Sequence, residues 1–202
     1  SVSTATATAL ANVANDPKGI HERGITPATT RYYGVAVQGE RHVYPYFLPD
    51  DTMVPSAAKK RLPGKVFPSE GKISKAELFG QRLFNKGGRN VVVTEGETDA
   101  MAAYQLQGSK YPAVSVQNAG AALKDCKRNY EWLDSFDTVT ICFDNDEAGQ
   151  KAALEVADLF SGKSKIMRLG QYKDAVEILI DGAKGRSAWK DAFWGAEEYT
   201  PE

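Results

Sequence analysis

The sequence predicts an α/β protein in which a smaller α+β part precedes a mostly parallel sheet covered by helices. From Asn90 onward, short β-branched runs alternate with helical segments, which is the order typical of a parallel sheet. Upstream, aromatic and β-branched runs flank Gln38–Glu40, which predicts an antiparallel hairpin. The pattern changes at Arg89, so we expect an N-terminal subdomain of small helices, antiparallel strands and a basic ridge over residues 1–88. Residues 89–202 would form the α/β subdomain, with helices at its C-terminal end.

The N-terminal part contains few strong signals. Residues 1–18 are rich in Ala and Thr and predict a flexible lead-in or a weak helix. Thr26 followed by Pro27 is a helix start, because threonine caps and proline suits the first helical position. Strands are expected on both sides of the 38–40 turn. Residues 74–84 predict an amphipathic helix that is capped by Ser74 and ended by a glycine pair.

The second part predicts four strands and four helices in alternation. Apolar and β-branched runs mark the strands, and Gly108 ends the first helix. The expected strands cover residues 90–95, 112–117, 137–143 and 165–169, and the expected helices cover residues 97–107, 129–136, 146–160 and 173–181.

Composition excludes several classes of protein. Of the 202 residues, 42% are hydrophobic and 25% are charged, which is typical of a soluble globular protein, and no apolar run reaches membrane-spanning length. The net charge of −1 argues against a chain that is basic throughout. The two cysteines and two histidines lack zinc-ligand spacing, and Cys142 lies within an apolar strand, where packing explains it. This cysteine usage fits a reducing compartment.

One stretch is strongly basic. Between Lys59 and Lys75, six Lys or Arg residues stand against a single acid, Glu70. Taken alone, such a run favours a solvated loop or an edge strand kept soluble by its lysines. A phosphate-binding ridge is the functional alternative.

Carboxylates follow three strands of the predicted sheet, at the point where each strand ends. Glu95 follows the first strand, Asp144 and Asp146 follow the third, and Asp174 follows the fourth. Because parallel strands end at the same edge of a sheet, these groups would converge, and repulsion would oppose that unless cations neutralised them. Oxygen ligands without His or Cys select Mg²⁺, Mn²⁺ or Ca²⁺, and Mg²⁺ is typical of phosphoryl or nucleotidyl transfer. For Asp144 or Asp146 taken alone, a helix N-cap is the favoured explanation, but capping does not easily produce the joint pattern.

These motifs resemble a known domain. The runs VVVTEGETDA, ICFDNDEAGQKA and KDAVEIL are similar to the three motifs of the TOPRIM domain of bacterial-type primases, topoisomerases and some nucleases. HERGIT, LFGQRLF and NYEWLDSFDTVTICFDNDEAG extend the resemblance to the RNA polymerase domain of bacteriophage bifunctional primase–helicases. The mitochondrial helicase Twinkle is a more distant relative. The resemblance covers roughly residues 20 to 202.

The resemblance implies roles for individual residues. Glu95, Asp144, Asp146 and Asp174 match the catalytic and metal-binding positions, which would hold one or two Mg²⁺ ions that Mn²⁺ can replace. Glu97 and Asp99 match acidic positions that support the site. Lysines upstream of the TOPRIM motifs bind nucleotide phosphates in this family, so the candidates are Lys59, Lys65, Lys72 and Lys75. Asn118, in a loop after another strand, is a nucleotide-contact candidate, although an ordinary turn explains that loop as well.

The implied activity is DNA primase catalysis, that is, RNA primer synthesis from ribonucleoside triphosphates on a single-stranded DNA template. No cysteine pairs of a zinc module and no phosphate-binding loop of a helicase motor occur in the sequence, so we expect an isolated catalytic domain without zinc, whose parent chain supplies both modules. The implied setting is a phage replisome in the host cytoplasm, away from membranes. A TOPRIM nuclease and a non-catalytic DNA-binding module of a helicase remain as alternatives. A topoisomerase is disfavoured, since its tyrosine lies in a separate domain of which the sequence shows nothing.

Overall fold

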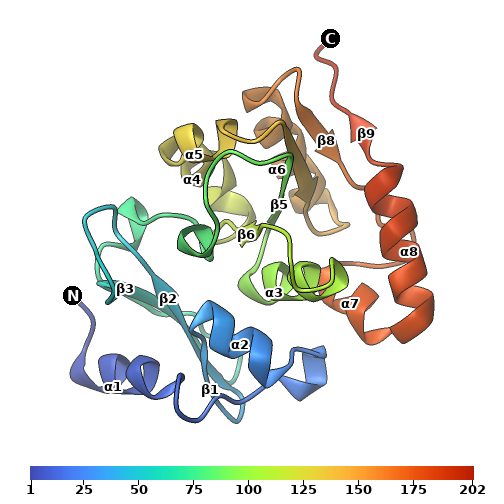
Figure 1. Cartoon of the computed structure of the whole chain (residues 1–202). Helices are drawn as coiled ribbons and strands as arrows, with labels where there is room; N and C mark the ends of the chain where they lie inside the picture. The colour runs from blue at the N-terminus through green and yellow to red at the C-terminus, as the bar shows by residue number, and fades with distance from the viewer.

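The computed structural model describes residues 1–202 and contains two sheets (Figure 1). A four-stranded sheet lies in the N-terminal part, and a five-stranded sheet lies in the C-terminal part. The two parts lie side by side in both ribbon views, with helix α3 on the side of the C-terminal part that faces the first sheet. The predicted α/β class is therefore confirmed, whereas the division at residue 88 stays a prediction.

The N-terminal sheet is antiparallel, in the order β1-β2-β3-β4. Its strands are β1 (Ala36–Gln38), β2 (Arg41–Tyr46), β3 (Ala57–Arg61) and β4 (Ser69–Glu70). The predicted hairpin is present, since Gln38 pairs with Arg41. Helix α2 (Pro27–Tyr33) begins as predicted, because the Thr26 side chain accepts the Thr29 N–H.

The weak-helix alternative for the N-terminus is confirmed by α1 (Thr4–Asn12). The Ser3 hydroxyl accepts the Thr6 N–H, which caps the helix. Glu70 then binds the start of α1 to the sheet, because its carboxylate accepts the Ser3 N–H at 2.6 Å and the Thr6 hydroxyl at 2.7 Å. The short helix η1 (His21–Arg23) connects α1 to α2.

The predicted helix over residues 74–84 is wrong. The chain forms only two short 3₁₀ turns there, η2 (Ile73–Lys75) and η3 (Gln81–Leu83). Between them, the backbone of Phe79 exchanges hydrogen bonds with Ser115 at 3.0 and 3.1 Å, and Gly80 adopts a left-handed φ of 83°. Backbone pairing with the edge of the second sheet therefore takes the place of helical hydrogen bonds. The periodicity of residues 74–84 cannot predict this pairing, because the partner strand is remote in the sequence.

The C-terminal sheet has the order β6-β5-β7-β8-β9 and is parallel except at β9. Its strands are β5 (Asn90–Thr94), β6 (Ala113–Ser115), β7 (Thr138–Cys142), β8 (Ser164–Ile166) and β9 (Glu197–Glu198). All four predicted strands are present. Thr94 pairs with Cys142, so the chain leaves β5 and β7 at the same edge of the sheet.

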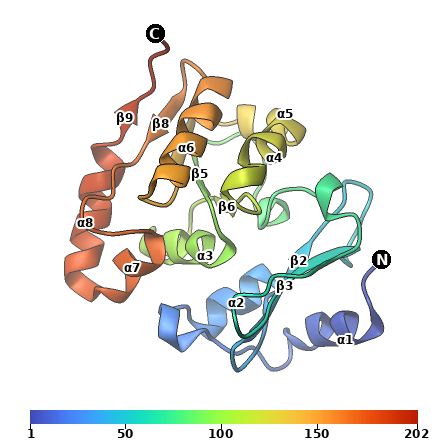
Figure 2. The ribbon, with the colours of Figure 1, turned by 180° about the vertical axis from the view of Figure 1, so that it is seen from behind.

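Helices cover both faces of this sheet (Figure 2). On one face lie α4 (Ala122–Arg128), α5 (Tyr130–Asp134) and α6 (Glu147–Leu159), with a short turn η4 (Ala119–Ala121) before them. On the other lie α3 (Glu97–Leu106), α7 (Ala175–Ile180) and α8 (Gly182–Trp194). Alternate strand residues supply the two cores: Val92 packs with α3, and Val91 and Val93 pack with α6.

The first of these two cores also extends beneath the N-terminal sheet. It includes Tyr44, Tyr46 and Phe79 together with Met101 of α3, so one apolar cluster joins the two sheets. Tyr33 belongs to the same cluster, whereas Tyr32 is largely exposed. No helix of the structure is both long and apolar enough to cross a membrane.

Candidate active site

A cleft of about 610 Å³ lies between the basic edge of the N-terminal sheet and the strand ends of the parallel sheet. We call it the central cleft. One wall carries cations from the N-terminal part, and the other carries carboxylates that follow β5, β7 and β8. Its charged lining residues are Arg23, Lys59, Arg61, Lys65, Glu95, Glu97, Asp99, Asp144, Lys173 and Asp174.

Three carboxylates meet on the acidic wall. Asp99, Asp144 and Asp174 each place an oxygen within 4.8 Å of the other two. Asp99 is buried, and the other two are half-buried. The sequence-predicted residues Asp144 and Asp174 are therefore neighbours in space, although 30 residues separate them in the sequence. The third member is Asp99, which the sequence assigned only a supporting role.

Local hydrogen bonds hold these three carboxylates in place. Asp174 caps α7 by accepting the Glu177 N–H at 2.9 Å, and Asp99 accepts the Val176 N–H of the same helix at 3.1 Å. Asn145 fixes the loop that carries Asp144: its backbone N–H donates to the Lys173 carbonyl at 2.7 Å. Its side chain donates to the Gly170 carbonyl at 2.8 Å. The loops after β7 and β8 are therefore joined by hydrogen bonds.

The other two predicted carboxylates occupy different surroundings. Glu95 lines the central cleft, and its Oε1 accepts the Asp144 N–H at 3.3 Å. Asp146 does not line the cleft; it is exposed, and it caps α6 by accepting the Gly149 N–H at 2.7 Å. Asp146 thus has the capping role that the sequence kept as an alternative. The metal-binding roles of all four predicted carboxylates, Glu95 and Asp146 included, stay predictions.

Two carboxylates of the cluster, Asp99 and Asp144, and the neighbouring Glu95 resist ionisation. Burial, followed by repulsion from Glu95 and Asp174, raises the pKa of Asp144 to about 7. Burial also raises the pKa of Asp99 well above its usual range, and repulsion from Asp174 and Asp144 adds to the effect. The pKa of Glu95 rises for the same first reason, burial. Neutralisation by a cation would relieve this repulsion.

The donor set fits a hard divalent cation. All three groups offer oxygen atoms, and no His or Cys lies among them, which suits Mg²⁺ or Mn²⁺ rather than zinc. Ligand oxygens at about 2.1 Å from one Mg²⁺ lie about 3–4 Å apart, so side-chain rotations of small size would bring the cluster around one ion. Asp99, Asp144 and Asp174 would hold such an ion, with Glu95 beside it.

Lys59 on the basic wall is already paired. Its ammonium lies 3.0 Å from Glu97 Oε2 and donates to the Gln117 carbonyl at 2.6 Å. The Tyr46 hydroxyl donates to the same Glu97 carboxylate at 2.5 Å. This buried group connects β2 and β3 to α3 directly beside the acidic cluster. Lys59 therefore has a structural role in addition to the phosphate contact predicted from the sequence.

Three other cations of the wall have more freedom. Lys65 is exposed on a tight turn closed by pairing between Leu62 and Val66. The Arg61 guanidinium lies 5.3 Å from the centre of the Phe67 ring, and Arg23 donates to the Thr98 hydroxyl at 3.1 Å. None of the three forms an ion pair with a carboxylate. They are available to an anionic ligand in the central cleft.

The remaining predicted residues lie apart or at the margin. Lys72 and Lys75 are exposed and do not line the central cleft. Asn118 does line it, but its Oδ1 accepts the Ala121 N–H at 2.9 Å and so caps η4. The structure therefore separates two of the four lysines from the site.

Sequence reasoning did not assign Arg23, Arg61, Phe67 or Lys173 to the site, although all four line the central cleft, and it gave Asp99 only a supporting role. A signal existed for Arg61, because residues two apart on a strand share a face, so Lys59 and Arg61 point the same way while Lys60 pairs with Glu70. A signal also existed for Asp99, which lies in the first turn of α3, four residues after Glu95. Arg23 and Phe67 come from a short 3₁₀ helix and a loop, whose placement only the fold decides.

Comparison with known proteins gives the same picture. A family model described as Toprim-like matches residues 92–179. The DNA helicase/primase of Enterobacteria phage T3 is 39% identical over 146 residues, which cover 71% of this chain and 25% of that protein. The chain thus spans about a quarter of the length of this curated relative.

Solved structures extend the match. The primase fragment of the bacteriophage T7 primase–helicase is 36% identical, with a TM-score of 0.77 over 88% of this chain and 74% of that one. In a second T7 structure, the primase domains are described as bound to an RNA/DNA hybrid and dTTP; there the TM-score is 0.79 over 91% of this chain and 93% of that one, again at 36% identity. A DnaG primase catalytic domain bound to ssDNA shares the fold at 16% identity, with a TM-score of 0.63 over 94% of this chain and 75% of that one. The chain belongs to the TOPRIM primase domains of the bacteriophage primase–helicases.

Proposed function

We propose that this chain is a DNA primase catalytic domain, which joins ribonucleoside triphosphates into short RNA primers on a single-stranded DNA template. The observation that carries the proposal is the central cleft itself. Three carboxylates within 4.8 Å of one another face unpaired cations across a space large enough for a nucleotide. The relatives support the template and nucleotide parts, since the T7 domains are described with an RNA/DNA hybrid and dTTP.

In the proposed reaction, a primer 3′-hydroxyl attacks an α-phosphate and pyrophosphate leaves. Mg²⁺ bound at Asp99, Asp144 and Asp174 would lower the pKa of the hydroxyl and neutralise charge on the phosphate oxygens. Arg61 and Lys65 stand on the opposite wall, where they would hold the triphosphate by charge-assisted hydrogen bonds. Glu95 would orient the Asp144 loop through its contact with the Asp144 N–H.

The proposal includes the surroundings of the domain. The chain corresponds to a quarter of the T3 helicase/primase, so we infer a parent chain that also carries a helicase motor and a zinc-binding module for template reading. The site of action would be the replisome in the host cytoplasm. Without those modules, the domain would extend a supplied primer more readily than it starts a new one.

The test is primer extension. A labelled RNA primer annealed to single-stranded DNA is incubated with ribonucleotides and Mg²⁺, and the products are separated on a gel. We expect longer products that disappear in the Glu95→Gln variant. Shortened nucleic acid would indicate a nuclease. Bound DNA with neither change, even when Mn²⁺ is added, would indicate a non-catalytic binding module.

Asp146→Asn separates the two roles considered for Asp146. Asparagine caps helices as well as aspartate does, so α6 would keep its start while the charge is removed. If Asp146 only caps α6, extension persists. If extension is lost while the melting temperature stays the same, Asp146 contributes to metal or substrate binding.

A further inference from the structure

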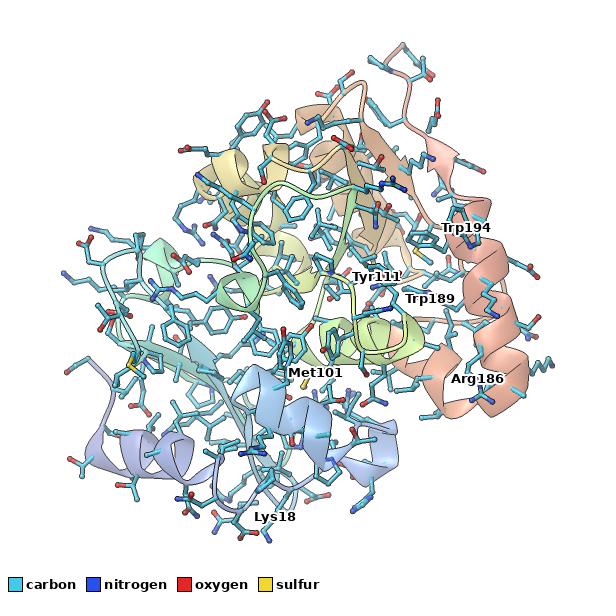
Figure 3. All side chains as sticks on the ribbon, viewed as in Figure 1. Lys18, Met101, Tyr111, Arg186, Trp189 and Trp194 are labelled. Atoms are coloured by element: carbon cyan, nitrogen blue, oxygen red, sulfur yellow. The ribbon has the colours of Figure 1, made fainter.

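A second hollow lies at the opposite edge of the parallel sheet from the carboxylates. Its volume is about 720 Å³. The beginnings of β5 and β6, the end of α3 and the last turns of α8 line it. We call it the aromatic hollow. Figure 3 labels three of its residues, Tyr111, Trp189 and Trp194, in the region between α3 and α8. This volume lies within the range of pockets that hold small ligands.

Ring surfaces dominate the aromatic hollow, and two of them face solvent. Trp189 is buried and forms part of the floor, whereas Trp194 is 82% exposed and Tyr111 is 55% exposed. Burying Trp194 against the core would be favourable, because a tryptophan carries a large apolar surface. The structure leaves this ring at the rim of a hollow instead, which suits it for stacking on a flat ligand.

The aromatic hollow also carries positive charge without a partner. Arg89 and Lys190 line it, and no carboxylate does. Neither cation forms an ion pair anywhere in the molecule. Arg89 comes from the start of β5 and Lys190 from α8, so the two charges reach the hollow from different elements. An anionic group would find both.

One polar group in the lining lacks a hydrogen bond. Gln107, at the end of α3, lines the aromatic hollow, and its Nε2 is buried without any acceptor. A buried donor without a partner costs free energy, so native structures rarely keep one. A ligand carbonyl or ring nitrogen at the floor of the hollow would supply the missing acceptor.

We propose that the aromatic hollow is a second nucleotide-binding site, in which a base stacks against Trp194 and Tyr111 while its phosphate contacts Arg89 and Lys190. A nucleotide uses all three features: a flat ring, an anionic group and a base edge that accepts a hydrogen bond. A purely apolar peptide side chain would use only the rings. The site is separate from the central cleft, so the inference does not depend on the catalytic assignment.

The test maps photochemical adducts on the full chain in EDTA, with two probes. 8-Azidoadenosine triphosphate represents a free nucleotide, and an oligothymidylate with one 5-iododeoxyuridine represents a single strand. After irradiation, mass spectrometry of the peptides should locate adducts at Tyr111 or in residues 189–194, and unlabelled nucleotide should compete. Adducts from the first probe only would assign a free nucleotide; adducts from the second only would assign a strand.

Variants decide whether the adducts report this site. Trp194→Ala should raise the half-saturating probe concentration at least about fivefold, since stacking on one aromatic ring contributes that much or more. Lys190→Ala should raise it about threefold and lower the log–log salt slope by about 1. Lys184→Ala, an exposed lysine on the same helix outside the hollow, is the matched control and should change nothing. Lys65→Ala in the central cleft should leave these adducts intact.

Three results would overturn the proposal. The first is the absence of adducts in the aromatic hollow with both probes. The second is adducts that Trp194→Ala and Lys190→Ala leave unchanged while each variant keeps the wild-type melting temperature. The third is displacement of the probe by an Asp-Asp-Asp-Trp peptide at a lower concentration than by nucleotide, which would make the hollow a peptide site. Primer extension measured in parallel keeps the outcome for the central cleft distinct.

Discussion

Replacing Asp144 by asparagine should stabilise the metal-free protein at pH 8 while abolishing catalysis. The pKa of this carboxyl rises from 3.8 to about 7 on folding, first through burial and then through repulsion from neighbouring carboxylates. A rise of about three in pKa corresponds to about 4 kcal/mol if nothing screens the charge. Solvent reaches this half-buried group and screens its charge, so the expected gain in the free energy of unfolding is about 1–2 kcal/mol.

The effect must depend on pH with a definite sign. Because the folded pKa lies above the unfolded one, the folded state holds more protons between pH 4 and 7. The contribution of Asp144 to the free energy of unfolding is therefore fully present below about pH 4, and it is lost as the pH rises through about 7. Asparagine has no charge to lose, so the gain of Asp144→Asn should be present at pH 8 and nearly absent at pH 4.

Thermal unfolding in EDTA measures this gain. For a chain of this length, about 1–2 kcal/mol corresponds to a melting temperature higher by about 2–8 °C at pH 8. Adding Mg²⁺ should reverse the order, because the ion stabilises the wild-type fold by mass action and binds the variant more weakly. Asp137→Asn removes an exposed carboxylate at the other edge of the sheet, so it should leave the melting temperature unchanged.

Primer extension completes this prediction. Loss of a direct metal ligand should lower the rate by more than about a hundredfold, since even indirect partners of metal ligands contribute about 10–100-fold. A melting temperature that falls by several degrees in EDTA at pH 8 would refute the reasoning. It would show that Asp144 supports the fold by its charge, in which case repulsion is not the dominant effect in the cluster.

Three further substitutions test other parts of the central cleft. Lys65→Ala should raise the apparent KM for nucleotide about tenfold without changing the melting temperature, because the side chain is exposed and forms no ion pair. Lys59→Ala should lower stability by about 3–5 kcal/mol in urea unfolding, since it leaves the buried Glu97 carboxylate unpaired. Gly149→Ala should cost about 1–3 kcal/mol and reduce extension, because its Cβ would lie 2.2 Å from the Asp144 carbonyl oxygen.

Matched variants give each of these tests a reference. Lys72→Ala removes a lysine outside the cleft and should leave KM unchanged; an equal rise in both lysine variants would mean that general charge, not Lys65, holds the nucleotide. Gly120→Ala meets no atom closer than 3.4 Å and should be tolerated. If Lys59→Ala unfolded at the same urea concentration as the wild-type protein, the buried ion pair would be contradicted. If Gly149→Ala extended primers as fast as the wild-type protein, the close packing of α6 on the Asp144 loop would be contradicted.

Much of the fold of residues 89–202 was predictable from local pattern. Runs such as Val91–Val93 lie between two helical layers, so all three residues are apolar, and the helices between the strands have clear starts and ends. The pairing of Asp144 with Asp174 followed from one rule, that parallel strands end at the same edge. The same approach gave a wrong result for residues 74–84. Backbone pairing of Phe79 with Ser115 outweighs the local helix propensity there, because such propensity is weak compared with tertiary contacts.

The amino-acid sequence by itself determined that acidic residues would gather at one edge of a parallel sheet, because strand and helix periods and capping residues act over a few neighbouring positions. Only the tertiary structure decided which of them meet. Asp99 joins Asp144 and Asp174 because α3 packs against α7 and turns its first helical turn toward the strand ends, whereas Asp146 caps α6 outside the cleft. Contacts between distant segments also pair Lys59 with Glu97 and leave Lys65 free. Such distinctions depend on distances of a few ångströms between elements that are remote in the chain, and no local pattern encodes them.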